Sequence, residues 1–262
     1  MRRTSFAILL ILLVLAACTG SPFAAPTATP VPTNTVPPTD TPLPTETSTP
    51  LPTSTPDQTA TAAVEATKSA QGVLDEMTQV LDDIDIAFSN GYLAWQQTKP
   101  IAINMSGPDS GYEQIGEGLT AQNFILKSDV TWNATGLLLC GAIFRSEPNL
   151  DKGAQYQFVF MRFSGLPAWA IEVHEFGQFS NSPTRVQYSD AIDQGNGGTN
   201  EIILVAREEQ FNLYINKVYQ GRYFDYSKQR MDGSLAFLGY QQSGKKGSCE
   251  FENSWLWVLN ED

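Results

Sequence analysis

The chain is poor in the side chains that carry much of enzyme chemistry: its 262 residues include one histidine, His174, and three cysteines. No Ser/His/Asp set can be argued from the sequence, and one histidine with two oxidisable cysteines does not make a zinc cluster. Basic residues are also scarce, with 16 Lys and Arg against 28 Asp and Glu. Without a basic patch to neutralise phosphates, the sequence argues against nucleic-acid binding.

Long apolar runs are absent after the first 17 residues. Arg2 and Arg3 precede Phe6–Ala17, a run too short for a comfortable membrane span and typical of an export signal. It leads into Leu-Ala-Ala-Cys18, which resembles a bacterial lipobox, where the cysteine thiol receives a diacylglycerol. We expect residues 1–18 to be a lipoprotein signal peptide, with an ordinary signal peptide as the alternative. The mature protein is then exported, lipid-anchored to a membrane, and faces the cell exterior or periplasm.

Residues 19–56 consist mostly of Thr and Pro. Such a segment has almost nothing to bury, so it is predicted to be a disordered linker with a bias to polyproline II. Thr/Pro tracts of exported proteins are also candidates for O-glycosylation, and a bare spacer is the simpler interpretation.

Residues 57–83 have the pattern of an amphipathic helix. Small and apolar residues recur there, and just beyond, at spacings of three and four: Ala66, Ala70, Val73, Leu74, Met77, Val80, Leu81 and Ile84. We expect a connector helix that docks this stripe on the following domain. A short self-associating coiled coil is the alternative.

Residues 84–262 are predicted to be one all-β domain. Period-two runs lie between Gly, Pro, Asn and Asp clusters, and the expected strands are Tyr92–Trp95, Ile101–Met105, Phe124–Trp132, Gly136–Arg145, Gln155–Phe163, Ala168–Phe176, Arg185–Tyr188, Glu201–Arg207, Phe211–Ile215, Val218–Phe224, Ser234–Tyr240 and Cys249–Leu259. Many short strands joined by turns indicate a sandwich or barrel. The run GLLLCGAIF is apolar on both faces, which suits a strand whose second face is also partly covered.

The run NEIILVAREEQFNLYINKVYQG, residues 200–221, resembles the penultimate hairpin of laminin-G-like domains in the concanavalin A-like lectin/glucanase superfamily. Gly233–Gly239 and Phe251–Trp257 follow in the order of that family, and CGAIFRSE and QYQFVFMRFSG resemble its central strands. The resemblance covers most of residues 124–260 and implies an antiparallel jelly-roll β-sandwich. Lys217 stands where the family usually has a turn glycine, a departure confined to the hairpin tip.

The glucanase branch of that superfamily places its catalytic carboxylates on one strand as Glu-x-Asp-x-Glu, so that alternation points them into one cleft. The nearest run here is AIEVHEFG. Glu172 matches the first position, but His174 and Phe176 stand where the Asp and the second Glu belong. The resemblance therefore implies a domain without the glycosidase dyad. Glu172 and His174 share a strand face and are candidates for a small polar ligand site, with a plain surface pair as the alternative.

Two further sets of residues are candidate ligands. The aromatic residues Trp169 and Tyr156 would suit stacking on sugar rings if they lined a concave face, although core packing uses most aromatics of a sandwich. Asp190, Asp193 and Asn196 offer oxygen atoms to a calcium ion, although Gly/Asn/Asp clusters are usually plain loops. No other cofactor is expected.

The two cysteines beyond Cys18 are expected to pair. Cys140 lies in a central predicted strand and Cys249 opens the last one, and terminal strands of this fold run close to central ones. An exported domain with two cysteines predicts a Cys140–Cys249 disulfide, with two buried thiols as the alternative.

Three functions remain open from the sequence. The leading hypothesis is a monomeric, non-enzymatic domain that binds a carbohydrate, inferred from fold analogy alone. The second is a glycoside-processing enzyme, because some relatives are keto-disaccharide hydrolases. The third is a structural or protein-interaction domain of the cell envelope.

The lipobox generates a direct prediction. Mass spectrometry of the mature protein purified from membranes should find an acylated N-terminal Cys18. An unmodified N-terminus elsewhere in the chain would contradict lipid anchoring.

Overall fold

The computed structural model describes residues 58–163, 165–226 and 230–260, with side chains from residue 71 onward except that of Phe163. The predicted signal peptide, the lipobox and the Thr/Pro linker lie outside these residues. Over the described residues, no helix combines the length and apolar character needed to cross a membrane. The described chain begins with α1 (Gln58–Asp83) and a short 3-10 turn, η1 (Phe88–Asn90), and continues as strands.

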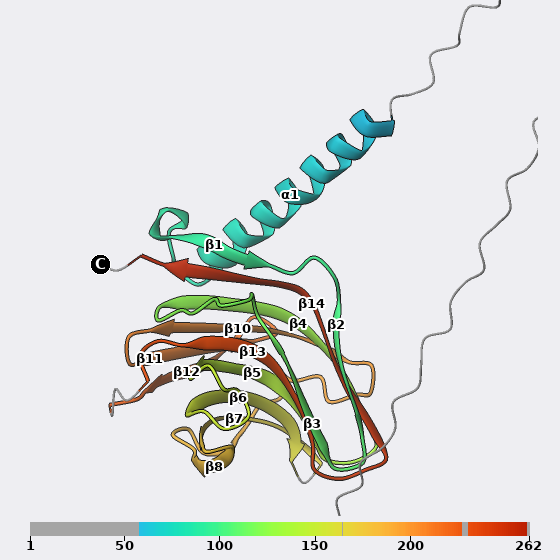
Figure 1. Ribbon diagram of the computed structural model, residues 1–262, viewed down its shortest axis with the longest axis vertical. Coiled ribbons are helices and arrows are strands. Elements are labelled where there is room, and N and C mark those ends of the chain that lie inside the picture. Colours follow the sequence, from blue (N-terminus) through green and yellow to red (C-terminus); the bar gives the residue numbers. More distant parts are fainter. Residues whose placement is uncertain (1–57, 164, 227–229, 261–262) are drawn as a thin grey trace, which may run out of the picture. The chain divides into compact units, whose positions relative to one another are not determined.

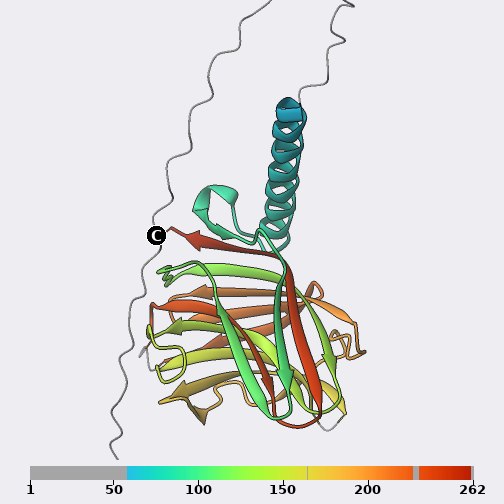
Figure 2. The same ribbon diagram turned by 45° about the vertical axis from the view of Figure 1, so that its right-hand side comes forward.

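Two antiparallel sheets of seven strands each form a sandwich, as the sequence predicts (Figures 1 and 2). Sheet A has the order β1-β14-β4-β10-β11-β12, with β2 also paired to β14, and sheet B has the order β3-β13-β5-β6-β7-β8, with β9 also paired to β7. The bounds are β1 Gly91–Gln96, β2 Ile101–Ser106, β3 Asp109–Gln114, β4 Phe124–Ala134, β5 Leu138–Ser146, β6 Gln155–Phe163, β7 Leu166–Glu175, β8 Gln178–Asn181, β9 Gln187–Tyr188, β10 Thr199–Arg207, β11 Gln210–Ile215, β12 Val218–Phe224, β13 Ser234–Gln241 and β14 Lys246–Leu259.

Each strand expected from the sequence is present, and two more were missed. The missed strands are β3 (DSGYEQ) and β8 (QFSN), which lie at the two ends of the main path of sheet B. Both are short and polar, so neither shows the apolar alternation that identifies a half-buried strand. They form because edge strands can pair their backbone with a neighbour while most of their side chains remain in water.

The facing sides of the two sheets enclose the main core. Its largest fully buried side chains include Trp132, Phe158, Trp169 and Phe237. Within it, Cys140 of β5 and Cys249 of β14 form the predicted disulfide, with Cα atoms 5.7 Å apart. The bond links a central strand of sheet B to a central strand of sheet A.

The outer face of sheet A is covered by the C-terminal part of α1, which ends beside β1 and β14 in Figure 1. Met77, Val80 and Leu81 are buried there against a cluster that includes Trp257 of β14, so this part of the apolar stripe docks as expected. Leu74, also in the predicted stripe, is exposed.

An ion pair joins α1 to the sheet. The ammonium group of the buried Lys127 on β4 lies 2.7 Å from Glu76 of α1 and 3.0 Å from Asp129. Burial alone would lower the pKa of Lys127, but the hydrogen bonds and charges of these two carboxylates raise it above its ordinary value. The lysine therefore remains charged under an apolar cover, which ties the helix to one position on the sheet.

The hairpin between β11 and β12 turns at Asn216-Lys217, as predicted. Both residues have positive φ, 49° and 66°, as a type I′ turn requires. The side chain of Asn216 stabilises the turn by donating to the Ala191 carbonyl and accepting from the Glu201 amide.

The disulfide closes a loop with a sequence separation of 109 residues. Replacing Cys140 and Cys249 together by Ala should lower the free energy of unfolding by about 4–5 kcal/mol, because the unfolded chain regains the entropy of that loop. Urea unfolding of the oxidised protein and the double variant measures this difference. Equal unfolding midpoints would contradict a structural role for the bond.

Candidate functional site

The outer face of sheet B carries a groove of about 470 Å³. Its floor is made of aliphatic side chains that alternate with core residues along β5, β6 and β13: Leu139, Ile143, Val159, Met161 and Leu238. No described helix covers this face, in contrast to the α1-covered face of sheet A. An open apolar face of this kind marks a binding surface more often than an unused one.

A polar corner adjoins the aliphatic floor. Gln157 of β6 and Glu172 of β7 are directly opposite in the strand pairing, and His174 is two residues further along β7. His174 Nε2 donates to Glu172 Oε2 at 3.0 Å, and each of these two side chains is 18% exposed. Gln157 is only 8% exposed, and no other described group hydrogen-bonds to its side-chain amide. The amide atoms of Gln157 are not among the buried side-chain atoms that lack a partner, so they are open to solvent in the groove and can bond a polar group there.

The loop between β5 and β6 folds over one end of the groove. Leu150 packs onto the aliphatic floor, and the next residue, Asp151, accepts a hydrogen bond from the hydroxyl of Tyr112 on β3. The Asp151 carbonyl lies against Gly177 of the β7–β8 turn, where a Cβ atom would collide with it and where φ is +73°. Glycine at this position therefore allows the loop to reach both walls of the groove.

The two strands missed from the sequence supply the walls. Tyr112 of β3 and Tyr240 of β13 are both exposed along one wall, and Tyr240 pairs with Ser110, two residues before Tyr112. Phe179 of β8 forms the other wall, edge-on to the His174 ring at 6.0 Å between ring centres. Aromatic rings therefore flank the floor on both sides.

The ionisation of Tyr112 reflects its position under the loop. Burial, followed by the charge of Asp151 and its hydrogen bond, raises the pKa of Tyr112 above its ordinary value of 10.0. The direction of the shift fits a phenol that donates its proton in a hydrogen bond to the Asp151 carboxylate.

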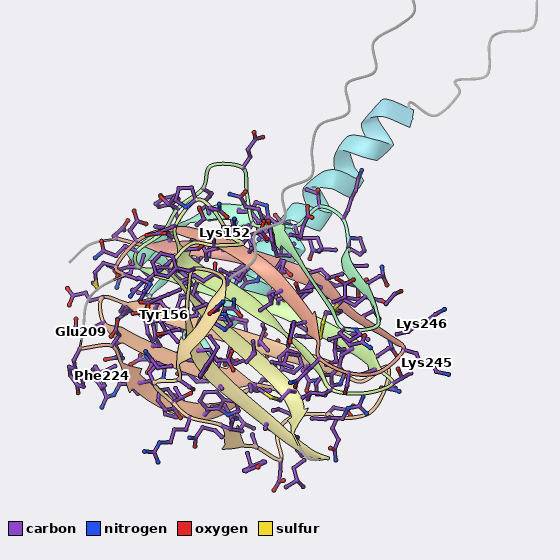
Figure 3. The ribbon with its side chains drawn as sticks, turned by 60° about the horizontal axis from the view of Figure 1, so that its bottom comes forward. Lys152, Tyr156, Glu209, Phe224, Lys245 and Lys246 are labelled. Atoms are coloured by element: carbon purple, nitrogen blue, oxygen red, sulfur yellow. A yellow bond between two sulfur atoms is a disulfide. The ribbon has the colours of Figure 1, made fainter. Side chains whose placement is uncertain are left out.

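Glu172 and His174 face the groove together, as their shared strand face predicts. The other two predicted ligand residues lie on the wrong side of sheet B. Trp169 is 1% exposed in the core, edge-on to Tyr223, and Tyr156 is buried with its hydroxyl bonded to Asp225 (Figure 3). Both predictions are wrong because strand alternation turns positions 156 and 169 toward the other sheet.

The groove holds two carboxylates, Asp151 and Glu172, and they come from different elements. Phe176, where the glycosidase pattern needs its second acid, lies in the turn after β7 and is 86% exposed. The described part of the strand thus has no second acid aimed into the groove.

Two of the predicted calcium residues, Asp193 and Asn196, form hydrogen bonds that stabilise the loop before β10. The side-chain oxygen of Asn196 accepts from the Ala134 amide and from Arg162, each at 3.0 Å, and Asp193 Oδ1 accepts from the Gly195 amide at 2.9 Å. Over the described residues, no group of three His, Cys, Asp or Glu side chains could hold a metal. A calcium site that includes Asp190 therefore stays a prediction without structural support.

Gln157, Tyr112 and Asp151 were missed from the sequence. Alternation along QYQFVFMRF contains a usable signal for Gln157, since residues of one parity enter the core and those of the other face the groove. Tyr112 had no such signal, because β3 was not recognised as a strand. Asp151 lies in a loop whose position depends on tertiary contacts.

The contact between Tyr112 and Asp151 can be tested by titration. Replacing Asp151 by Asn should lower the pKa of Tyr112 toward 10.0, because the charge of the carboxylate is removed. NMR titration of ¹³C-labelled tyrosine measures this, with Tyr223, which lies on another sheet, as the internal control. An unchanged Tyr112 pKa would show that the loop does not reach β3 in solution.

No protein-family model and no curated protein matches the sequence. The solved structures with a similar fold include the carbohydrate-binding module CBM66 from Bacillus subtilis, at 16% identity and a TM-score of 0.44 over 64% of this chain and 91% of that one. A β-glucanase of Bacillus licheniformis has 6% identity and a TM-score of 0.43 over 66% and 84%. A κ-carrageenase from Pseudoalteromonas carrageenovora, solved with a κ-carrageenan oligotetrasaccharide, has 7% identity and a TM-score of 0.42 over 65% and 83%. At these scores the similarities carry no argument about ligand or activity, which have to be argued from the groove itself.

Proposed function

We propose that the groove on the outer face of sheet B binds a glycan. The observation that carries this proposal is the amide of Gln157, a residue that is 8% exposed and lines the groove beside Glu172, at the edge of an aliphatic floor. A sugar ring has the matching chemistry, with a C–H face that packs on apolar side chains and hydroxyl groups that bond amides and carboxylates.

The size and borders of the groove support the same function. Its volume of about 470 Å³ lies within the range of small-ligand sites, roughly 300–1,000 Å³. The exposed rings of Tyr112 and Tyr240 on one wall, and of Phe179 on the other, are suited to pack against sugar rings. Shape and polarity together favour a short stretch of glycan.

We also propose that the domain is displayed outside the cytoplasm on a lipid anchor at Cys18. The lipobox-like run and the Thr/Pro segment support this, because a signal of that type is normally followed by a spacer that separates the domain from the membrane. A binding domain on such a spacer would hold the cell against glycans in its surroundings.

A glycoside-processing enzyme is the second candidate, and the Glu172–His174 pair inside the groove favours it. A carboxylate and an imidazole 3.0 Å apart can move a proton. The second carboxylate of β7, Glu175, is paired with Arg230 and does not line the groove, which counts against the two-acid mechanism of glycosidases.

Binding to Gln157 is the sharpest test. The purified full chain should bind at least one oligosaccharide of a panel of neutral, acidic and amino glycans. Replacing Gln157 by Leu should weaken that binding by about tenfold, because one ligand hydrogen bond is lost while the volume is nearly kept. Calorimetry measures the affinity.

The matched control is Gln220 of β12, on sheet A, where replacement by Leu should leave the affinity unchanged. No binding across the panel, or equal losses in both variants, would contradict a glycan site in the groove. The same samples report the second candidate: newly formed reducing ends that disappear in Glu172→Ala would establish an enzyme.

A further inference from the structure

The described lining of the groove carries negative charge without a compensating cation. Asp151 and Glu172 are its two carboxylates, and none of the described lining residues is Lys or Arg. The hydrogen-bond partners of the two acids are a phenol, Tyr112, and an imidazole, His174, rather than a fixed positive charge.

Basic residues near the lining residues in sequence, among them Arg185 beside Val186, are not part of the described lining. Lys152 follows Asp151 but does not line the groove, and Arg230 lies 2.6 Å from Glu175 in an ion pair. Lys245 and Lys246 project from the turn between β13 and β14 at the edge of the molecule (Figure 3). The two groove carboxylates, Asp151 exposed on its loop and Glu172 18% exposed, are thus the acidic groups of the described lining, and Glu172 is the less screened of the two.

A second, independent observation indicates that a ligand binds near these two carboxylates. The side chain of Gln157, a residue that is more than nine-tenths buried, lines the groove, and its amide has no hydrogen-bond partner among the described residues and is open to the groove. Its strand partner is Glu172, so a ligand that satisfies the amide lies next to a carboxylate.

Resting on the proposed glycan function, we infer that the groove selects glycans that carry a free amino group and rejects glycans that carry carboxylate or sulfate groups. An ammonium group beside Glu172 and Asp151 gains charge-assisted hydrogen bonds, whereas an anion is repelled by both acids. Asp151 and Glu172 are thus the specificity-determining residues, and Gln157 and the floor bind any sugar of suitable shape.

Three β-1,4-linked tetramers with the same backbone test this selection: cellotetraose, which is neutral, the glucosamine tetramer, which is cationic, and the tetramer of glucuronic acid, which is anionic. Calorimetry with the full chain at low salt should find the glucosamine tetramer bound at least fivefold more tightly than cellotetraose and the anionic tetramer unbound. Raising the salt concentration should reduce that preference.

Variants separate the groove from the general acidity of the chain. Glu172→Gln and Asp151→Asn should each reduce the preference for the glucosamine tetramer by about fivefold, with cellotetraose affected less. Glu250→Gln, which removes an exposed acid of β14 on sheet A, is the matched control and should change nothing. Equal losses in all three variants would overturn the inference, because the attraction would then come from the net charge of the whole protein.

The remaining outcomes are also decisive. Equal affinity for cellotetraose and the glucosamine tetramer would overturn the inference and leave the glycan function standing. Tight binding of the anionic tetramer would do the same. If none of the three tetramers binds, the inference is wrong as stated, and the wider glycan panel then decides the proposed function separately.

Discussion

The alternation of side chains along β6 and β7 is the constraint on which the groove depends. One set of positions fills the space between the sheets, with Tyr156 and Trp169 among them, and the other set faces outward, with Gln157 and Glu172 opposite each other. A slip of one residue in either strand would exchange the two sets. The core and the groove therefore share one register, and the packing that stabilises the fold also positions the polar corner.

Both outer faces of the sandwich have apolar centres, but they differ in which segments of the chain cover them. Sheet A is covered by α1, which is held by Met77, Val80 and Leu81 and by the ion pair between Glu76 and Lys127. On sheet B, the loop that carries Leu150 and Asp151 covers one end of the outer face, and no helix among the described residues covers the rest. The part of this face that lines the groove is the surface for which we propose ligand binding.

Inside the groove, two pairs of polar side chains contact each other, and a third polar group stands alone. Tyr112 is held by Asp151, and Glu172 is bonded to His174, while Gln157 has no partner among the described residues. The amide of Gln157 is therefore free to bond a group that enters the groove. A ligand hydroxyl or amine would complete the set, and the charge of the two acids would select among ligands of similar shape.

The sequence by itself determined the local elements: the helix up to Asp83, the strands with strong alternation and the turn at Asn216-Lys217. These depend on periodicity and on residues that tolerate positive φ, which are properties of neighbouring residues. It also predicted the Cys140–Cys249 pairing, from the small number of cysteines and the implied fold. Only the tertiary structure decided which side of β5 and β13 faces the core, because both sides of these two strands are mostly buried. It likewise decided the walls of the groove, since β3 and β8 are stabilised by pairing with strands distant in sequence.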